Sequence, residues 1–206
     1  HGRDLLGAFR RLAATAAVEL VTSGATHGFL PLMLGRRELW RAQIFTAVQE
    51  HRRHFGRGPE GIWLPECGFD PGVDDVLRDA GLRYFFSDAH GILHAHPRPR
   101  FGVHAPILTP NGVAAFGRDL ESSRQVWCGW MGYPGDFDYR EFYRDVGWDL
   151  DYEYVRPYLH ADGNRTNLGI KYYRITGAGP HKEPYHFERA AAKADVHAEH
   201  FVSSRQ

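Results

Sequence analysis

The chain has 206 residues, of which 43% are hydrophobic and 14% aromatic, a composition typical of a folded domain and unlike that of a disordered protein. Its 25 acidic residues balance its 25 basic residues, so no strong net charge favours binding to nucleic acid or to an anionic membrane surface. No apolar run reaches the roughly 18 residues of a membrane span or resembles a signal-peptide core, so neither a membrane protein nor an exported one is expected.

Helices and strands are predicted to alternate along the first half of the chain. Helical periodicity predicts helices at residues 4–16, 38–55 and 70–81. For the third helix, the Asp70-Pro71-Gly72 turn is the start signal, with Asp70 as the N-cap. Apolar, β-branched and aromatic runs predict strands at residues 18–24, 61–66 and 82–88. Strands that alternate with helices in this way indicate an α/β fold with a parallel sheet.

Polar side chains lie at or just after the C-terminal end of each of the three predicted strands. The strand ends carry His27, Glu66, and Asp88 with His90. In parallel α/β folds ligands bind over the C-terminal ends of the strands, because the variable loops gather there. Core packing explains the apolar bodies of these strands but not three polar tips together. A functional site at this edge of the sheet is therefore expected.

The segment 91–111 contains four prolines and no helical period, and it is predicted to be a long loop over the same edge of the sheet. Three histidines lie in or near it at positions 94, 96 and 104, but no carboxylate or cysteine joins them at ligand spacing. In "HKEPYH" (181–186), Pro184 breaks the helix that a helical zinc motif needs. Neither a metal site nor a cofactor is predicted.

Aromatic residues are dense in the segment 124–145, which contains Trp127, Trp130 and Tyr133 around a Tyr-Pro-Gly-Asp turn, with a helix predicted to begin near Tyr139. Flat aromatic faces beside a few carboxylates suit a sugar-binding groove, since a sugar ring offers an apolar face and a fringe of hydroxyls. Ordinary core packing of these aromatics is the alternative. Both interpretations stay open from the residues alone.

Several motifs spread over nearly the whole chain resemble glycoside hydrolase family 57, in the subgroup that includes the glycogen (1,4-α-glucan) branching enzymes. They are "ATHGFLPL" (25–32), "WLPECGF" (63–69), "YFFSDAH" (84–90), "GYPGDFDYREFYRDVGWDLDYEYV" (132–155) and "LGIKYYRITG" (168–177). The resemblance implies an incomplete (β/α)7 barrel, similar to a TIM barrel, with a helical C-terminal part. Residues 1–206 would be a fragment of one catalytic domain, truncated at both ends. Residues 1–120 would supply barrel strands and helices, and residues 121–206 a helical and loop region on the barrel rim.

The resemblance also implies roles for individual residues. Glu66, which follows the strand in WLPEC, is expected to be the catalytic nucleophile of a retaining enzyme. His27 would hydrogen-bond sugar hydroxyls, and Trp127 or Trp130 would stack on a sugar ring. Further substrate-binding candidates are Tyr133, Asp88 and His90. The expected activity is α-1,4 to α-1,6 glycosyl transfer on glycogen, amylose or amylopectin, through a covalent glycosyl group on Glu66.

Two departures from the family pattern affect this expectation. A histidine-rich first strand and the aspartate that serves as general acid would both lie outside residues 1–206, so the chain alone is expected to be inactive. The loop 91–111 has no tyrosine of the kind that shields the intermediate in branching enzymes, so hydrolysis or disproportionation stays an alternative to branching.

Two other classes of protein also stay open, and each has an observation that would identify it. One is a metal-dependent enzyme on a similar barrel, such as a polysaccharide deacetylase or an α-mannosidase, which metal analysis would reveal. The other is a non-catalytic relative that binds glucan without turnover. The two cysteines, Cys67 and Cys128, form no CxxC pair, and a reducing cytoplasmic setting is expected for the protein.

Overall fold

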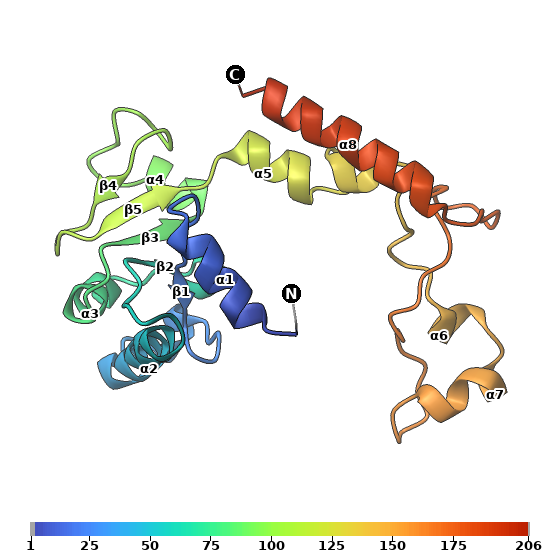
Figure 1. The fold of residues 1–206 in the computed structure, drawn as a ribbon, viewed down its shortest axis with the longest axis horizontal. Helices are drawn as coiled ribbons and strands as arrows, with labels where there is room; N and C mark the ends of the chain where they lie inside the picture. Colours follow the sequence, from blue (N-terminus) through green and yellow to red (C-terminus); the bar gives the residue numbers. More distant parts are fainter. Residues whose placement is uncertain (1–2, 206) are drawn as a thin grey trace. The chain divides into compact units, whose positions relative to one another are not determined.

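The computed structural model describes residues 3–205, which form two compact units that meet in sequence between Asp119 and Leu120 (Figure 1). Each unit is described by itself below. No helix within residues 3–205 is both long enough and apolar enough to cross a membrane. The assignment of the two parts of the chain to a barrel and its rim stays a prediction.

The first unit is built on a mixed sheet. Among the described residues its strands are β1 (Thr22–Ser23), β2 (Gly61–Trp63), β3 (Tyr84–Ser87), β4 (Ile107–Leu108) and β5 (Ala114–Gly117), in the order β1-β2-β3-β5-β4. β1, β2, β3 and β5 run parallel, and β4 runs antiparallel to β5 at the edge. The prediction of a parallel sheet is therefore confirmed for β1, β2 and β3, but it did not include β4 and β5. β5 is a short Ala-Ala-Phe-Gly run that becomes a strand through its pairing with β3, a contact that local propensity does not reveal.

The predicted strands are longer than the observed ones. The strand predicted at 18–24 is confined to β1, and the one at 61–66 ends at Trp63, because the chain enters a 3₁₀ turn at Pro65–Cys67. The observed loop is shorter than the one predicted at 91–111, because α4 (Ala89–Leu93) extends to Leu93 and β4 takes up residues 107–108.

Helices α1 (Leu5–Ala14), α2 (Arg37–Phe55) and α3 (Val73–Asp79) lie close to their predicted positions. α2 ends at Gly56, whose left-handed φ of 75° closes the helix as a C-cap. The predicted start of the third helix is wrong: the N-cap is Gly72 rather than Asp70. Gly72 has a φ of 95°, which separates the Asp70-Pro71 turn from the helix that begins at Val73.

The core of the first unit lies between the sheet and two helices. Helices α2 and α3 lie side by side on one face of the sheet (Figure 1). Their buried residues form one hydrophobic cluster with Ile62 and Phe85 of the central strands. The opposite sheet face carries a row of aromatic rings whose neighbouring centroids are 5.6 to 6.2 Å apart. It is formed by Trp63, Tyr84 and Phe86, which are partly buried, and by Phe116, which is exposed. The sheet therefore has a helix-covered face and an aromatic face.

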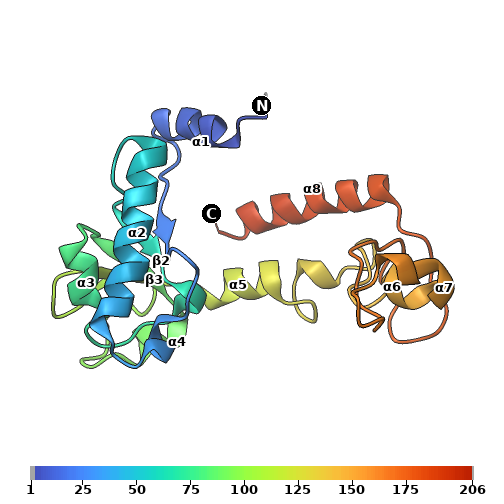
Figure 2. The same cartoon turned by 90° about the horizontal axis from the view of Figure 1, so that it is seen from below.

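The second unit consists mainly of helices and irregular chain. Its longer helices are α5 (Leu120–Trp127) and α8 (Phe187–Ser203), and two short helices, α6 (Val146–Asp149) and α7 (Tyr152–Val155), lie next to each other (Figure 2). The described residues of this unit contain no helix that begins near Tyr139, so that prediction is wrong. Residues 139–146 instead exchange backbone hydrogen bonds with residues 170–175, for example Glu141 N to Tyr173 O at 2.9 Å. This pairing between distant segments outweighs the local helical pattern.

Candidate active site

Glu66 lies on a tight turn that directly follows β2. The turn is closed by backbone hydrogen bonds from Cys67 N to Leu64 O at 2.9 Å and from Gly68 N to Pro65 O at 3.0 Å. Glu66 and Cys67 both adopt left-handed backbone conformations, with φ of 53° and 55°. Each such residue costs on the order of 1 to 2 kcal/mol. Surrounding packing must therefore hold the turn in place.

Two neighbours of Glu66 supply that packing. Pro65 is buried, and a Cβ atom on Gly68 would lie only 2.3 Å from Cε2 of Phe29, so the chain approaches Phe29 as closely as only glycine allows. The Glu66 side chain itself is 80% exposed. A rigid backbone thus presents a carboxylate to solvent, where a ligand can reach it.

His27 lies beside this carboxylate, at the end of the loop that follows β1. Its Nε2 atom is 3.8 Å from Oε1 of Glu66, and its Nδ1 atom is 3.1 Å from Oγ of Ser23. The His27 side chain is 54% exposed, so it contributes little to the core. The structure brings together two residues that the sequence placed at neighbouring strand ends.

Asp88 and His90 follow β3. Oδ1 of Asp88 accepts a hydrogen bond from Ala89 N at 2.8 Å and caps α4, while Oδ2 lies 3.7 Å from Nδ1 of His90. The Asp88 carboxylate therefore has a structural role as the N-cap of α4. Both side chains remain accessible to solvent, and His90 is the more exposed of the two. Their predicted role in binding substrate stays a prediction.

Arg118, after β5, is a residue of this edge that the sequence did not indicate, because β5 itself was not predicted. Its guanidinium lies 5.9 Å from the Trp63 ring centroid, and its backbone N donates to Ser87 O at 3.0 Å. Burial raises the pKa of the Cys67 thiol, and a hydrogen bond from Arg118 opposes that shift. Arg118 therefore belongs to the same edge of the sheet as Glu66.

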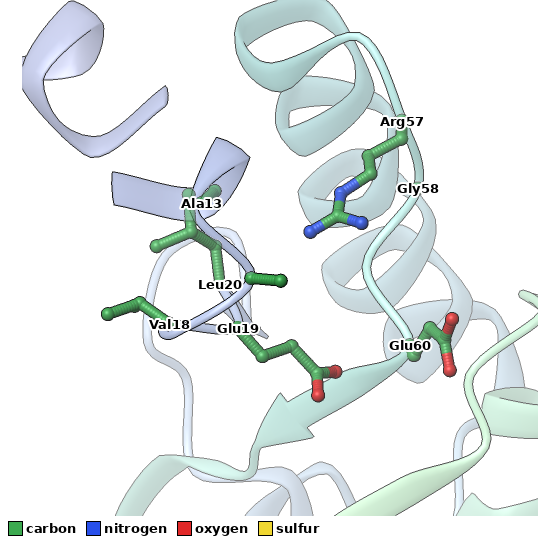
Figure 3. Close-up of a pocket in the computed structure, with 8 residues that line it drawn as sticks. Ala13, Val18, Glu19, Leu20, Arg57, Gly58 and Glu60 are labelled. Carbon is green, nitrogen blue, oxygen red and sulfur yellow. The ribbon is translucent and has the colours of Figure 1, made fainter. Parts of the chain in front are cut away.

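A pocket of about 260 Å³ lies at the other end of the strands, near the residues that lead into β2. Figure 3 shows it bounded by the segment 18–20 on one side and by the segment 57–60 on the other. The Glu19 carboxylate accepts a hydrogen bond from the Tyr84 hydroxyl at 2.7 Å, so it already has a partner. This pocket lies away from Glu66 and is not part of the candidate site.

The predicted aromatic residues lie in the second unit. Trp127 and Trp130 are 78% and 96% exposed, so within the described residues their side chains are not part of a packed core. Tyr133 stacks on His197 with ring centroids 4.5 Å apart, and its hydroxyl is 2.7 Å from Nδ1 of His200. Trp130, Tyr133 and both histidines line a pocket of about 410 Å³. Its aromatic faces and ring nitrogens suit a polar ligand with apolar faces.

Within residues 3–205 no group of three or more His, Cys, Asp or Glu side chains is arranged to hold a metal ion. The described cysteines, Cys67 and Cys128, are both free thiols. The side chains that the structure places at this edge of the sheet include the Glu66 carboxylate, the His27 imidazole and the Arg118 guanidinium.

Comparisons with known proteins give consistent matches. The family model for glycosyl hydrolase family 57 matches residues 1–201. The 1,4-alpha-glucan branching enzyme TK1436 of Thermococcus kodakarensis is 36% identical, over 97% of this chain and 31% of its own length. This chain therefore spans about a third of the length of the curated relatives that it matches.

Solved structures match the chain over nearly its whole length. The alpha-amylase AmyC from Thermotoga maritima is 44% identical with a TM-score of 0.81, over 98% of this chain and 40% of that one. The GH57-type branching enzyme from Pyrococcus horikoshii is 35% identical with a TM-score of 0.75, over 97% of this chain and 36% of that one.

Proposed function

The chain belongs to glycosyl hydrolase family 57, and from this membership we propose that the complete protein containing it acts on α-1,4-glucans with Glu66 as nucleophile. The observation that supports the proposal most directly is the Glu66 turn. An exposed carboxylate stands on a constrained backbone at a strand end, 3.8 Å from His27. Rigid placement matters for a nucleophile, because a displacement of about 1 Å can lower the rate about a hundredfold.

The proposed reaction has two steps. Oε of Glu66 attacks the anomeric carbon while a second carboxyl group protonates the leaving glycosidic oxygen, which gives a covalent glycosyl ester. An acceptor hydroxyl then attacks the same carbon, returns its proton to the second group and releases Glu66. Retaining enzymes hold the two carboxyl groups about 5 to 5.5 Å apart. We expect the second group to come from another part of the complete protein, so residues 1–206 alone would be inactive.

The sheet suits a place in an incomplete (β/α)7 barrel. In a barrel, helices cover the outer face of the sheet and side chains fill the interior. The packed α2 and α3 on one face and the aromatic row on the other match that division. In this arrangement Glu66, Asp88 and Arg118 would stand at the C-terminal rim, where barrel enzymes bind their substrates.

Branching is the activity we favour. Relatives from Thermococcus kodakarensis and Mycobacterium tuberculosis carry the name of branching enzyme or probable branching enzyme. Hydrolysis is the second candidate, because the α-amylase AmyC is 44% identical to this chain. The substrates would be glycogen, amylose or amylopectin, and the free thiols Cys67 and Cys128 suit a reducing cytoplasm.

The test is incubation of the complete protein with amylose, followed by enzymatic debranching and chain-length analysis, iodine staining and a reducing-end assay. Branching would release new short chains on debranching without a matching rise in reducing ends before it. Hydrolysis would raise reducing ends and create no branch points. Glucan binding without either change would identify a non-catalytic relative and contradict both candidates.

Replacement of His27 by Ala is expected to lower the rate of amylose turnover at least tenfold and to change the melting temperature little. The half-exposed ring contributes little to the core but faces the Glu66 carboxylate, where a sugar hydroxyl would lie. Initial rates and thermal melting of the complete protein measure the two effects. An unfolded variant would show instead that His27 serves the fold.

Replacement of Trp130 by Ala is expected to weaken binding of maltooligosaccharides several-fold without loss of stability. The ring is 96% exposed, so its removal leaves no cavity, whereas stacking on a sugar contributes on the order of 1 kcal/mol. Titration calorimetry on the complete protein gives the dissociation constants. Tyr154→Ala, which removes another exposed aromatic of the same unit outside the pocket, is the matched control. Equal affinities in the two variants would argue against a glucan site at Trp130.

A further inference from the structure

Gln43 of α2 holds the loop that carries His27, through both its main chain and its side chain. The Gln43 main-chain oxygen accepts a hydrogen bond from Ala25 N at 3.1 Å. Its side-chain Oε1 accepts from Thr26 N at 2.9 Å, and its Nε2 donates to Oγ1 of Thr26 at 2.7 Å. Both halves of the amide therefore bind the same loop residue, which lies directly before His27.

His27 needs such support because its backbone is strained. Its φ is 55°, a left-handed conformation that costs on the order of 1 to 3 kcal/mol outside glycine and persists only where the surroundings impose it. His27 N donates to Gly24 O at 3.0 Å and closes the turn. A Cβ on Gly24 would lie 3.4 Å from Gln43 Oε1 and 3.2 Å from Pro65, so the loop fits closely around this amide.

Ser23 orients the imidazole ring of His27. Oγ of Ser23 donates its hydrogen to the Trp63 carbonyl at 2.9 Å, so its lone pairs remain to accept a hydrogen bond from Nδ1 of His27 at 3.1 Å. Nδ1 therefore carries a hydrogen, and in the neutral ring Nε2 is the acceptor. That Nε2 atom faces the Glu66 side, at 3.8 Å from Oε1.

We propose that Gln43 and Ser23 are positioning residues for His27: Gln43 fixes the backbone of its loop, and Ser23 fixes the ring with the hydrogen on Nδ1. Nε2 is then presented to a hydroxyl of the sugar that Glu66 attacks. The inference rests on the proposed roles of Glu66 and His27. The printed contacts of both positioning residues are with the loop, the ring of His27 and the end of β2, so in this proposal each acts through His27.

The kinetic test is Gln43→Ala in the complete protein. We expect kcat/KM on amylose to fall roughly ten- to a hundredfold, the size of effect that a displaced site residue produces. Gln49→Ala, an exposed glutamine on the same helix, is the matched control and should leave the rate unchanged. Gln43→Glu keeps an acceptor for Thr26 N but loses the donor to Thr26 Oγ1, so an intermediate loss is expected.

A double-mutant cycle separates positioning from a general effect on the fold. In a His27→Ala background, Gln43→Ala should cause little further loss, because its route of action is gone. Losses that multiply would overturn the proposal. If Gln43→Ala does not fold, Thr26→Val, which removes only the hydrogen bond at 2.7 Å, takes its place in the same cycle with the same two outcomes.

The ring orientation is tested without any activity. Long-range ¹H–¹⁵N correlation spectra of the complete protein should show His27 with its hydrogen on Nδ1, and Ser23→Ala should remove that preference. An unchanged spectrum in Ser23→Ala would contradict the role of Ser23. This result is independent of Glu66: if Glu66→Gln kept its activity, the proposed function would fail while the spectra still decided how His27 is held.

Discussion

Replacement of Glu66 by Gln in the complete protein is expected to abolish turnover of amylose while glucan binding stays largely intact. Glutamine keeps the shape of the side chain and one oxygen acceptor, but its amide does not form the glycosyl ester. Because the Glu66 side chain is 80% exposed, the change should not disturb packing. Initial rates and binding constants for a maltooligosaccharide measure the two effects separately.

The matched control is Glu60→Gln, at the opposite end of the same strand. Glu60 lies directly before β2, is largely exposed and pairs with Arg83 at 3.4 Å, a contact that contributes little at the surface. The Glu60 variant should retain full activity. If the Glu66 variant kept more than about a hundredth of the original rate, Glu66 would not be the nucleophile.

Replacement of Asp145 by Ala is expected to destabilise the second unit by roughly 3 to 5 kcal/mol, since one buried and two partly buried N–H groups lose their acceptor. The Asp145 side chain is fully buried. Its carboxylate accepts hydrogen bonds from Gly147 N at 2.9 Å, Leu168 N at 2.8 Å and Gly169 N at 3.0 Å, so it joins two segments about twenty residues apart. Amide hydrogen exchange of these residues in the complete protein reports the loss.

Asp145→Asn distinguishes charge from shape. Asparagine retains one oxygen acceptor but directs an NH₂ group towards an N–H donor, so we expect an intermediate loss. Asp151→Asn is the control, because Asp151 caps α7 from an exposed position, with a single bond to Glu153 N at 2.9 Å. Equal protection from exchange in the Asp145 and Asp151 variants would show that the buried carboxylate does not hold the unit together.

The same carboxylate predicts a pH dependence. Burial alone would raise the pKa of Asp145, but the backbone donors of Leu168, Gly147 and Gly169 outweigh it and hold the pKa below its usual range. A lowered pKa in the folded state stabilises the fold above the ordinary carboxyl value of about 3.9, and this stabilisation disappears as the pH falls through the folded pKa. The second unit should therefore lose protection below about pH 4, and Asp145→Asn should remove this part of the dependence.

Local sequence patterns were sufficient to predict the elements that are stabilised mainly by residues close to them in the chain. The periodic apolar face of α2 and its Gly56 stop predicted that helix almost to the residue. The polar tips after three apolar runs predicted that His27 and Glu66 would lie at one edge of the sheet, since parallel strands end together. The motif around Glu66 also indicated the family to which the chain belongs.

Tertiary contacts decided what those patterns could not. β5 and the position of Arg118 depend on pairing with β3, and residues 139–145 form irregular chain instead of a helix because distant backbone groups bind them. The left-handed backbone of Glu66 and His27 is not a preference of those residue types but is imposed by packing against Phe29 and hydrogen bonding to Gln43. The sequence by itself determined which carboxylate and imidazole stand at the strand ends, whereas the rigid geometry in which they meet comes from partners far away in the chain, whose contacts no local periodicity encodes.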